Sequence, residues 1–292
     1  MTMTIEGRTA LVTGGAVRIG RTISAALARA GAAVAVHYRA SRAAAAALVQ
    51  ELRREGRRAL AVPGRLDTPA DAERLFQRAV RAAGPLDILV NNAAVFDKDS
   101  WTAMTPAALQ AELSVNLMAP MALMRAFAAQ GRPGVVINLL DRRIAGLDPA
   151  CVPYEISKKA LAEATRSAAW AWAPCIRVNA VAPGVVLPPP GEGPNRVRDL
   201  AGWIPLGRTV PLEDIAEAVL YLIRAESITG QILFVDGGQH LAGAGPWGTA
   251  SRPSRGHTRR RGRRPSPASL RMGRAPCHGQ LCRPNGRTGG RA

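Results

Sequence analysis

Short apolar runs alternate with amphipathic stretches along most of the chain, and this alternation constrains the fold more than any other feature. Strands are predicted at Thr9–Thr13, Ala33–Tyr38, Arg58–Pro63, Ile88–Asn91, Val135–Leu140, Ile176–Ala182 and Gln231–Val235. Helices are predicted between them, up to Ala30 after the first strand and then over Arg42–Glu55, Pro69–Ala83, Pro106–Gln130, Pro153–Ala171 and Leu212–Arg224. Strands that alternate with helices in this way form parallel βαβ units.

The predicted fold class is therefore α/β, with a doubly wound, Rossmann-type sheet of seven parallel strands and helices on both faces. The strands are apolar along their whole length, as expected when helices cover both sides of a sheet. In such sheets, ligands bind at the carboxyl ends of the strands. The residues that follow each strand are therefore the candidates for a functional site.

Positive charge is distributed unevenly along the chain. The net charge is +18, but residues 246–292 contain twelve arginines and neither Asp nor Glu. Those residues are rich in Gly, Pro, Ser and Arg, a composition that cannot bury a core. We therefore expect a folded domain over residues 1–245, followed by a disordered basic tail over residues 246–292.

The basic tail raises the alternative hypothesis of a dinucleotide-binding or nucleic-acid-binding protein without catalysis. Trp247 is the tail's single aromatic residue, and the chain contains no recognisable nucleic-acid-binding motif. We therefore expect no nucleic-acid partner. Apolar runs also fall well short of the roughly 18–20 residues of a membrane span, so no membrane partner is expected.

A cytoplasmic location is expected, because the first residues lack the basic and apolar regions of a secretion signal. In that compartment the four cysteines, Cys151, Cys175, Cys277 and Cys282, remain reduced thiols. The segment from Cys277 to Cys282 offers at most three metal ligands, without a second pair. No metal is expected.

A glycine-rich turn, Thr13–Gly20, follows the first predicted strand and opens the first predicted helix. Glycines permit a tight turn and let the backbone approach a pyrophosphate, while the N–H groups of the helix N-terminus bind it. Because tight turns often contain glycine for other reasons, the position between a strand and a helix is what favours a dinucleotide site.

The end of the second predicted strand indicates which dinucleotide binds. NAD-binding domains usually place an acidic residue there to bind the ribose diol, but His37–Arg42 contains none. Arg39 and Ser41 can bind a 2′-phosphate, and Arg18 adds a positive charge near the phosphates. These residues favour NADPH/NADP as the cofactor. The alternative is an ordinary solvated basic loop.

Tyr154 and Lys158 lie four residues apart at the start of a predicted helix, on one face of it. A tyrosine phenol has a reference pKa of about 10, and a nearby ammonium is expected to lower the pKa of Tyr154. Such a pair can supply a proton while a hydride arrives from a nicotinamide. The same spacing is common on surface helices. A catalytic role is favoured because the pair follows a predicted strand whose carboxyl end lies at the edge of the sheet where ligands bind.

Residues 5–242 resemble the short-chain dehydrogenase/reductase family. Besides the glycine turn and the Tyr154/Lys158 pair, the resemblance rests on segments in the family's order, namely Asn91–Ala94, Asn116 within Ser114–Leu117, Arg177–Gly184, Pro205–Arg208 and Thr229–Gly238. It implies that Tyr154 donates the proton, and that Lys158 lowers its pKa and holds the nicotinamide ribose. It also implies that Asn116 positions a water molecule in the proton relay.

The same resemblance completes the predicted cofactor site, because it places Asn92 and Ala93 along the cofactor and Pro183 and Gly184 beside the nicotinamide. The predicted cofactor-binding residues are Gly14, Arg18, Ile19, Gly20, His37, Tyr38, Arg39, Ser41, Asn92, Ala93, Tyr154, Lys158, Pro183 and Gly184. The predicted catalytic residues are Asn116, Asp141, Tyr154 and Lys158.

Asp141 departs from the family pattern, which has a serine thirteen residues before the tyrosine. A serine hydroxyl donates a hydrogen bond to a substrate carbonyl. An ionised aspartate cannot donate, and its charge opposes phenolate formation at Tyr154. Either Asp141 is protonated, or the substrate is not a simple ketone.

The pteridine reductases and dihydromonapterin reductases resemble this chain in having Asp at that place, Arg in the glycine turn and an aromatic residue after the Asn-Asn-Ala segment. This resemblance implies a pterin substrate, which Phe96 stacks on and Arg18 contacts. Asp141 and Tyr154 would then supply the proton. The alternative for Phe96 is a residue that packs a loop.

The predicted activity is the NADPH-dependent reduction of a dihydropterin to a tetrahydropterin. The alternative is a short-chain reductase that acts on another carbonyl or imine, with Asp141 a tolerated variant. Three departures leave the adenine contacts and the substrate open. Arg65 stands where the family has an acidic residue after the third strand, with Asp67 nearby, whereas Ala94 replaces a serine of the pteridine branch and Arg39 is one position earlier than that branch's arginine. Members of the family are commonly dimers or tetramers, so the resemblance also implies a homo-oligomer.

Overall fold

The computed structural model describes residues 4–187, 201–202 and 204–242, and all of them belong to one compact unit, Met1–Ser251. The predicted basic tail over residues 246–292, with Cys277 and Cys282, lies outside the described residues.

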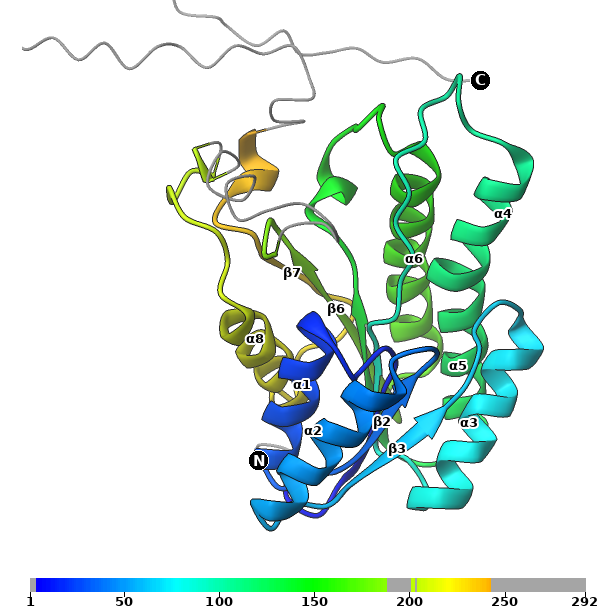
Figure 1. Ribbon diagram of the computed structural model, residues 1–292, viewed down its shortest axis with the longest axis vertical. Helices are drawn as coiled ribbons and strands as arrows, with labels where there is room; N and C mark the ends of the chain where they lie inside the picture. Colours follow the sequence, from blue (N-terminus) through cyan, green and yellow to red (C-terminus); the bar gives the residue numbers. More distant parts are fainter. Residues whose placement is uncertain (1–3, 188–200, 203, 243–292) are drawn as a thin grey trace, which may run out of the picture. The chain divides into compact units, whose positions relative to one another are not determined.

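The described residues form one seven-stranded sheet (Figure 1). Every neighbouring pair of strands is parallel, and the strand order is β3-β2-β1-β4-β5-β6-β7. The strands are β1 (Thr9–Val12), β2 (Ala33–Tyr38), β3 (Ala59–Pro63), β4 (Ile88–Asn91), β5 (Gly134–Leu139), β6 (Ile176–Pro183) and β7 (Ile232–Val235). The predicted fold class is confirmed.

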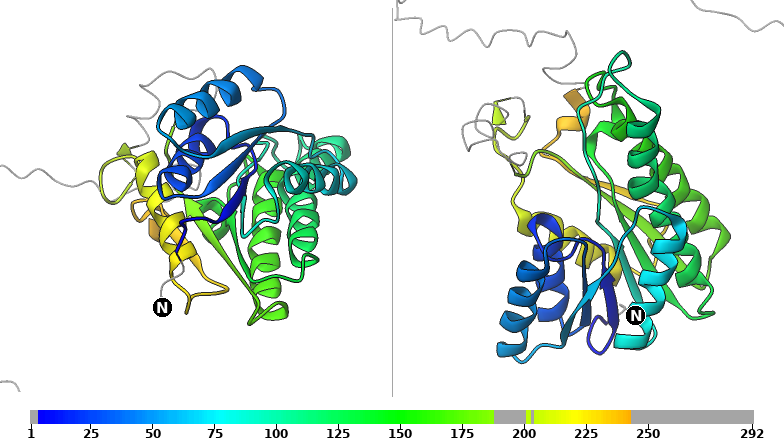
Figure 2. Two further views of the ribbon diagram at one scale, coloured as in Figure 1. Left: turned by 90° about the horizontal axis from the view of Figure 1, so that it is seen from below. Right: turned by 45° about the vertical axis from the view of Figure 1, so that its right-hand side comes forward.

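Helices cover both faces of this sheet, as Figure 2 shows from two directions. The helices are α1 (Arg18–Arg29), α2 (Arg42–Arg54), α3 (Pro69–Ala83), α4 (Pro106–Leu113), α5 (Ala119–Ala128), α6 (Val152–Ala171) and α8 (Leu212–Arg224). Shorter helical turns are the π-helix η1 (Ser114–Met118) and the 3₁₀ turns η2 (Arg142–Ala145) and η3 (Gln239–Ala242). Within the described residues, every helix is too short or too polar to cross a lipid bilayer.

Two apolar cores lie on opposite faces of the sheet. One contains the side chains of α1, α2 and α8, packed against strand residues such as Val36 and Val90. The other contains the side chains of α3, α5 and α6, packed against strand residues such as Leu89 and Val136. The alternation of strand side chains between the two faces explains why the central strands are apolar throughout.

The two edge strands, β3 and β7, are less buried than the prediction of strands covered on both faces implies. β1, β4 and most of β5 and β6 are buried, whereas β3 and β7 have several partly exposed residues. Leu233 in β7, for example, is 36% exposed. An edge strand has a neighbour on one side and shares its helices with the strand beside it, so its outer residues are less covered.

The long helical stretch predicted over Pro106–Gln130 is divided into α4, η1 and α5. In the π-helix, the Ala119 N–H donates to the carbonyl oxygen of Ser114, five residues earlier. Pro120 lacks an N–H and therefore cannot donate to the carbonyl of Asn116, four residues earlier, as an α-helix requires. The proline thus accounts for a change of helical register at Asn116, one of the predicted catalytic residues.

Candidate active site

The glycine-rich turn joins β1 to α1 at the carboxyl edge of the sheet. Gly14 has a φ of +59° and Arg18 a φ of +53°, a left-handed conformation that side chains other than glycine rarely adopt. A Cβ atom at Gly20 would lie 2.2 Å from the Gly14 carbonyl oxygen and 2.5 Å from Asn92 Nδ2. Glycine is therefore required at position 20 for α1 to start so close to the turn.

The side chain of His37, in β2, supports this turn. Its Nδ1 accepts a hydrogen bond from the Gly14 N–H at 3.0 Å, so the other ring nitrogen carries the proton and faces the Gly64 carbonyl at 3.4 Å. Burial lowers the pKa of His37 to about 4. His37 is predicted to bind the cofactor, and it lines the cavity beside the turn, but both of its ring nitrogens bond to the protein. Its polar groups therefore support the glycine turn.

A cavity of about 450 Å³ lies beside the turn. Ten of the predicted cofactor residues line it, namely Gly14, Arg18, Ile19, Gly20, His37, Tyr38, Arg39, Ser41, Asn92 and Ala93. The Thr13 hydroxyl accepts hydrogen bonds from the Asn92 and Ala93 N–H groups at 2.9 and 3.0 Å, which joins the turns after β1 and β4. The cavity thus opens where the chain order reverses in the sheet, the usual place for a dinucleotide.

The basic segment after β2 contributes Arg39 to this cavity. Its guanidinium lies 3.4 Å from Asp67, which also accepts a hydrogen bond from Arg65 at 2.6 Å. Asp67 therefore orients two arginines at the side of the cavity where the sequence predicts a 2′-phosphate. Arg39 is well exposed, so it is free to bond to an anion in the cavity.

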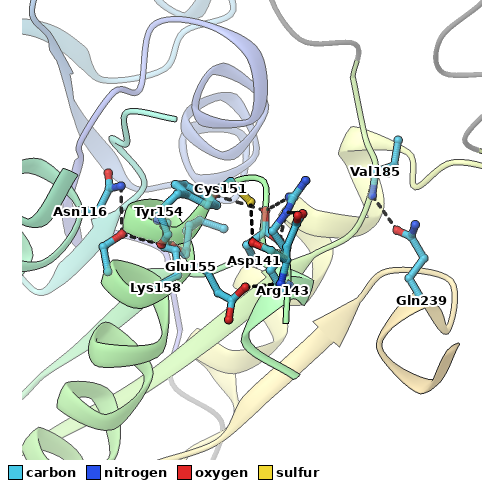
Figure 3. Close-up of polar contacts among 12 residues, drawn as sticks. Asn116, Asp141, Arg143, Cys151, Tyr154, Glu155, Lys158, Val185 and Gln239 are labelled. Atoms are coloured by element: carbon cyan, nitrogen blue, oxygen red, sulfur yellow. Dashed lines mark hydrogen bonds and ion pairs between the residues drawn. The ribbon is translucent and has the colours of Figure 1, made fainter. Parts of the chain in front are cut away.

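Tyr154 and Lys158 lie in the first two turns of α6, and both are buried. They do not line the cavity beside the glycine turn, and neither do Pro183 and Gly184. The Tyr154 hydroxyl donates to Asp141 Oδ2 at 3.3 Å, and Lys158 Nζ donates to the Leu139 carbonyl at 2.8 Å (Figure 3). Lys158 Nζ is 5.7 Å from the centre of the Tyr154 ring.

The predicted lowering of the Tyr154 pKa by Lys158 is wrong for this structure. Burial raises the pKa of Tyr154 well above its ordinary value, and the negative charge of Asp141 adds to the rise. Burial lowers the pKa of Lys158 to about 8, although the charges of Asp141 and Glu112 oppose that shift. Because the pKa of Tyr154 is raised by burial and by Asp141, the phenol stays protonated and can act as a proton donor.

Asp141 follows β5 and lies in a partly buried network of charges. Arg143 Nη1 donates to both carboxylate oxygens of Asp141 at 3.2 and 3.1 Å, and Arg143 Nε donates to Asp148 at 2.8 Å. Burial alone would lower the pKa of Arg143, but the charge of Asp141 and the bond to Asp148 outweigh it and raise that pKa. Asp141 is therefore held as one partner of an ion pair.

Phe96 completes this cluster from the loop after β4. Its ring meets the edge of the Tyr154 ring with centres 4.7 Å apart, and the Arg143 guanidinium lies 5.2 Å from its centre. Phe96 remains 37% exposed. The ring is therefore partly accessible to solvent, a position that fits both a residue that packs its loop and one that contacts a ligand.

Asn116 is fully buried and bonds to the same loop. Its side chain accepts from the Val95 N–H and donates to the Val95 carbonyl, both at 2.9 Å, and donates to Ser157 Oγ at 3.1 Å. It also donates to Glu112, one helical turn earlier. Val95 lines the cofactor cavity and Phe96 contacts Tyr154, so this loop connects the cavity with the catalytic residues.

Gly184 lies at the end of β6, where it packs closely against the end of β7. A Cβ atom there would lie 2.5 Å from Gln239 Oε1 and 2.7 Å from the Cα of Asp236. Gln239 Oε1 also accepts from the Val185 N–H at 2.9 Å (Figure 3). Pro183 and Gly184 thus start a tightly held segment at the carboxyl edge.

Two residues of the site were not found from the sequence. Arg143 lies two residues after Asp141, and its basic character alone gave no sign of burial. Glu112 lies four residues before Asn116, a spacing that puts both on one helix face and could have drawn attention to it. No group of three or more His, Cys, Asp or Glu side chains within the described residues is arranged to hold a metal ion.

A parallel sheet with a glycine turn, a cavity beside that turn and a buried Tyr–Lys pair is the arrangement of an oxidoreductase of the Rossmann type. Residues 15–240 match a family model described as enoyl-(acyl carrier protein) reductase. The putative ketoacyl reductase 2 of granaticin polyketide synthase from Streptomyces violaceoruber is 38% identical over 253 residues, which cover 81% of this chain and 97% of the relative. The chain belongs to the short-chain dehydrogenase/reductase family.

Two solved structures of similar proteins contain NADP. FolM alternative dihydrofolate reductase 1 from Brucella canis has a TM-score of 0.78 at 36% identity, and the match covers 82% of this chain and 96% of that one. Angucycline C-6 ketoreductase LanV has a TM-score of 0.77 at 32% identity, and the match covers 82% of this chain and 97% of that one. The predicted cofactor, NADPH/NADP, is thus confirmed at the level of the family.

Proposed function

We propose that this chain uses NADPH to reduce a dihydropterin to its tetrahydro form. The observation that carries the proposal is the cluster of Phe96, Tyr154, Asp141 and Arg143. It combines an accessible aromatic face, a neutral phenol and a fixed carboxylate within contact distance of one another. A pterin is a flat ring system with N–H and amino donors and a ring imine, and each of these features has a partner in the cluster.

The proton comes from Tyr154. When bound, NADPH would supply a hydride for the imine carbon, and Tyr154 would give its proton to the imine nitrogen, so the C=N bond would gain two hydrogens in total. The raised pKa of Tyr154 keeps that proton in place until the nitrogen becomes basic. Lys158, with a pKa of about 8, is still mainly an ammonium at neutral pH and compensates the phenolate that forms. Solvent then returns the proton to Tyr154.

Asp141 discriminates between substrate classes. Its carboxylate can accept hydrogen bonds from the ring N–H and amino groups of a pterin. The oxygen of a simple ketone is also an acceptor, so it cannot form a hydrogen bond with the carboxylate. Arg143 holds the carboxylate in place with two hydrogen bonds. The FolM structure, whose description names a dihydrofolate reductase, supports this choice by similarity, and the ketoreductase relatives support the alternative.

Arg18 and Arg39 are proposed to bind the phosphates of NADPH, with Arg39 and Ser41 on the 2′-phosphate. Lys158 is proposed to hold the nicotinamide ribose, and Asn116 to position a water molecule for the return of the proton. These roles rest on the family resemblance and on the position of Arg18, Arg39 and Ser41 around the cavity.

Tyr154→Phe is expected to lower kcat for dihydropterin reduction at least 100-fold, because general acid catalysis contributes about 10²–10⁴ in rate. The dissociation constant for NADPH should stay within about twofold, since the hydroxyl bonds to Asp141. Stopped-flow absorbance and fluorescence titration measure the two quantities. Tyr221→Phe on the exposed side of α8 is the matched control and should behave like wild type.

Asp141→Ser is expected to lower kcat/KM for dihydropterins about 10- to 100-fold, the effect of losing a hydrogen bond to a charged group. The same variant should reduce small ketones better than wild type, because the serine hydroxyl can donate to a carbonyl oxygen. NADPH consumption across a panel of dihydropterins and ketones measures both. A wild-type enzyme that turns over ketones and no pterin would contradict the proposed substrate.

Arg39→Ala is expected to raise KM for NADPH about tenfold and to leave KM for NADH nearly unchanged, because one charged hydrogen bond to the 2′-phosphate is lost. Steady-state kinetics with the two cofactors at a fixed substrate concentration measures the ratio. Arg166→Ala is the control, since Arg166 is an exposed arginine on α6 whose partner is Glu163. Equal losses for NADPH and NADH would show that Arg39 does not recognise the phosphate.

We also propose that the protein is a homo-oligomer that associates through α5 and α6. These helices lie on the same face of the sheet, and large apolar side chains are exposed on them or on the adjoining turn η1, namely Met118, Met121, Ile156 and Trp170. Trp170 is 89% exposed, which is unusual for a tryptophan away from an interface. Light scattering should give a mass of at least two chains, and Trp170→Glu should reduce it. A monomeric wild-type protein would contradict the proposal.

A further inference from the structure

The backbone on both sides of Phe96 is fixed by one pair of side chains. Asn116 bonds to the N–H and the carbonyl of Val95, both at 2.9 Å. Glu112 Oε1 accepts a hydrogen bond from the Asp97 N–H at 2.8 Å. Phe96 therefore lies between two anchored residues in a loop that has no sheet partners of its own.

Glu112 is also bonded to Asn116, so the two anchors form a single unit. Its Oε2 accepts from Asn116 Nδ2, and its side chain is fully buried. Asn116 in turn donates to Ser157 Oγ at 3.1 Å, and Ser157 donates to the Tyr154 carbonyl at 2.7 Å. One hydrogen-bonded chain of side chains thus joins the loop of Phe96 to the helical turn of Tyr154.

A buried carboxyl at this place carries an energetic cost. Burial raises the pKa of Glu112 to about 7, and the hydrogen bonds from Asp97 and Asn116 oppose the rise. An apolar side chain would avoid this cost but could accept neither hydrogen bond. The property that Glu112 supplies is therefore a pair of acceptors aimed at two donors.

We propose that Glu112 is a positioning residue for the substrate ring, which acts by holding the loop of residues 95–97 so that Phe96 faces Tyr154. The proposal rests on the proposed function in one respect, namely that Phe96 stacks on a flat substrate. Glu112 itself contacts neither the substrate nor the cofactor in this role. Its effect is on the separation between the stacking ring and the proton donor.

Glu112→Gln is the most specific variant, because it preserves the shape of the side chain and removes one acceptor. A carboxylate accepts from both the Asp97 N–H and Asn116 Nδ2, whereas a glutamine amide presents one oxygen and one NH₂ group. Either the Asp97 N–H or Asn116 Nδ2 then faces the NH₂ group of the glutamine, which is itself a donor. The loop should lose an anchor while the packing around position 112 is kept.

Fluorine NMR can follow Phe96 without any substrate. The chain has four phenylalanines, so the full-length protein labelled with 4-fluorophenylalanine gives four resonances, and Phe96→Leu assigns one of them. In Glu112→Gln the Phe96 resonance should shift or broaden. The resonances of Phe76, Phe127 and Phe234 should stay in place and report that the fold is intact.

Kinetics then separate positioning from a general loss of structure. Glu112→Gln is expected to raise KM for the dihydropterin about tenfold, the effect of one lost buried hydrogen bond, with kcat and the NADPH dissociation constant within about twofold. The matched control is Asp87→Asn. Asp87 is also buried and bonds to a backbone N–H, that of Thr9, but it precedes β4 at the opposite edge of the sheet. This control should leave both KM and the Phe96 resonance unchanged.

The outcomes distinguish this inference from the proposed function. An unchanged Phe96 resonance in Glu112→Gln overturns the inference, and so does a moved resonance with an unchanged KM. A moved resonance with a raised KM supports it. If the wild-type protein reduces no pterin, the proposed function fails, and KM is then compared for the substrate that the panel identifies.

Discussion

Parallel pairing of β1 with β4 and of β4 with β5 determines where every functional side chain lies. The register aligns Val12 with Val90 and Asn91 with Asn138, so the strands end at one edge of the sheet. Segments that are far apart in the sequence then emerge together. The glycine turn follows β1, the loop of Phe96 follows β4, and Asp141 follows β5. Because helices bury both faces, this edge is where the sheet can present polar groups to a ligand.

The charges at this edge are fixed by contacts within the protein. Arg143 bonds to Asp141 through its backbone N–H and its guanidinium, and it bonds to Asp148 at the same time, which fixes the Asp141 carboxylate. The lone pair that accepts the Tyr154 hydroxyl keeps the proton donor oriented. In a buried site such fixed charges act more strongly than in water and need no reorganisation during the reaction.

Sequence periodicity was sufficient for the fold, because each strand and each helix carries its own pattern of apolar residues. The helix predicted over Leu212–Arg224 is found with the same limits. The residues around the cavity beside the glycine turn were also predictable, since they lie in three short continuous segments. The protonation chemistry was not. Lys158 Nζ bonds to the carbonyl of Leu139 in β5, and the Arg143 guanidinium lies against Phe96 from the loop after β4, and neither contact follows from spacing along the chain.

Pro120 connects the local geometry of a helix with the candidate active site. The proline cannot donate to the carbonyl of Asn116, and the helix there changes to a π-turn. Asn116 and Glu112 nevertheless stay one turn apart, and both reach the loop of residues 95–97. The change of helical register therefore lies in the same stretch of chain that holds the loop, and the loop is held by side chains rather than by the backbone of this helix.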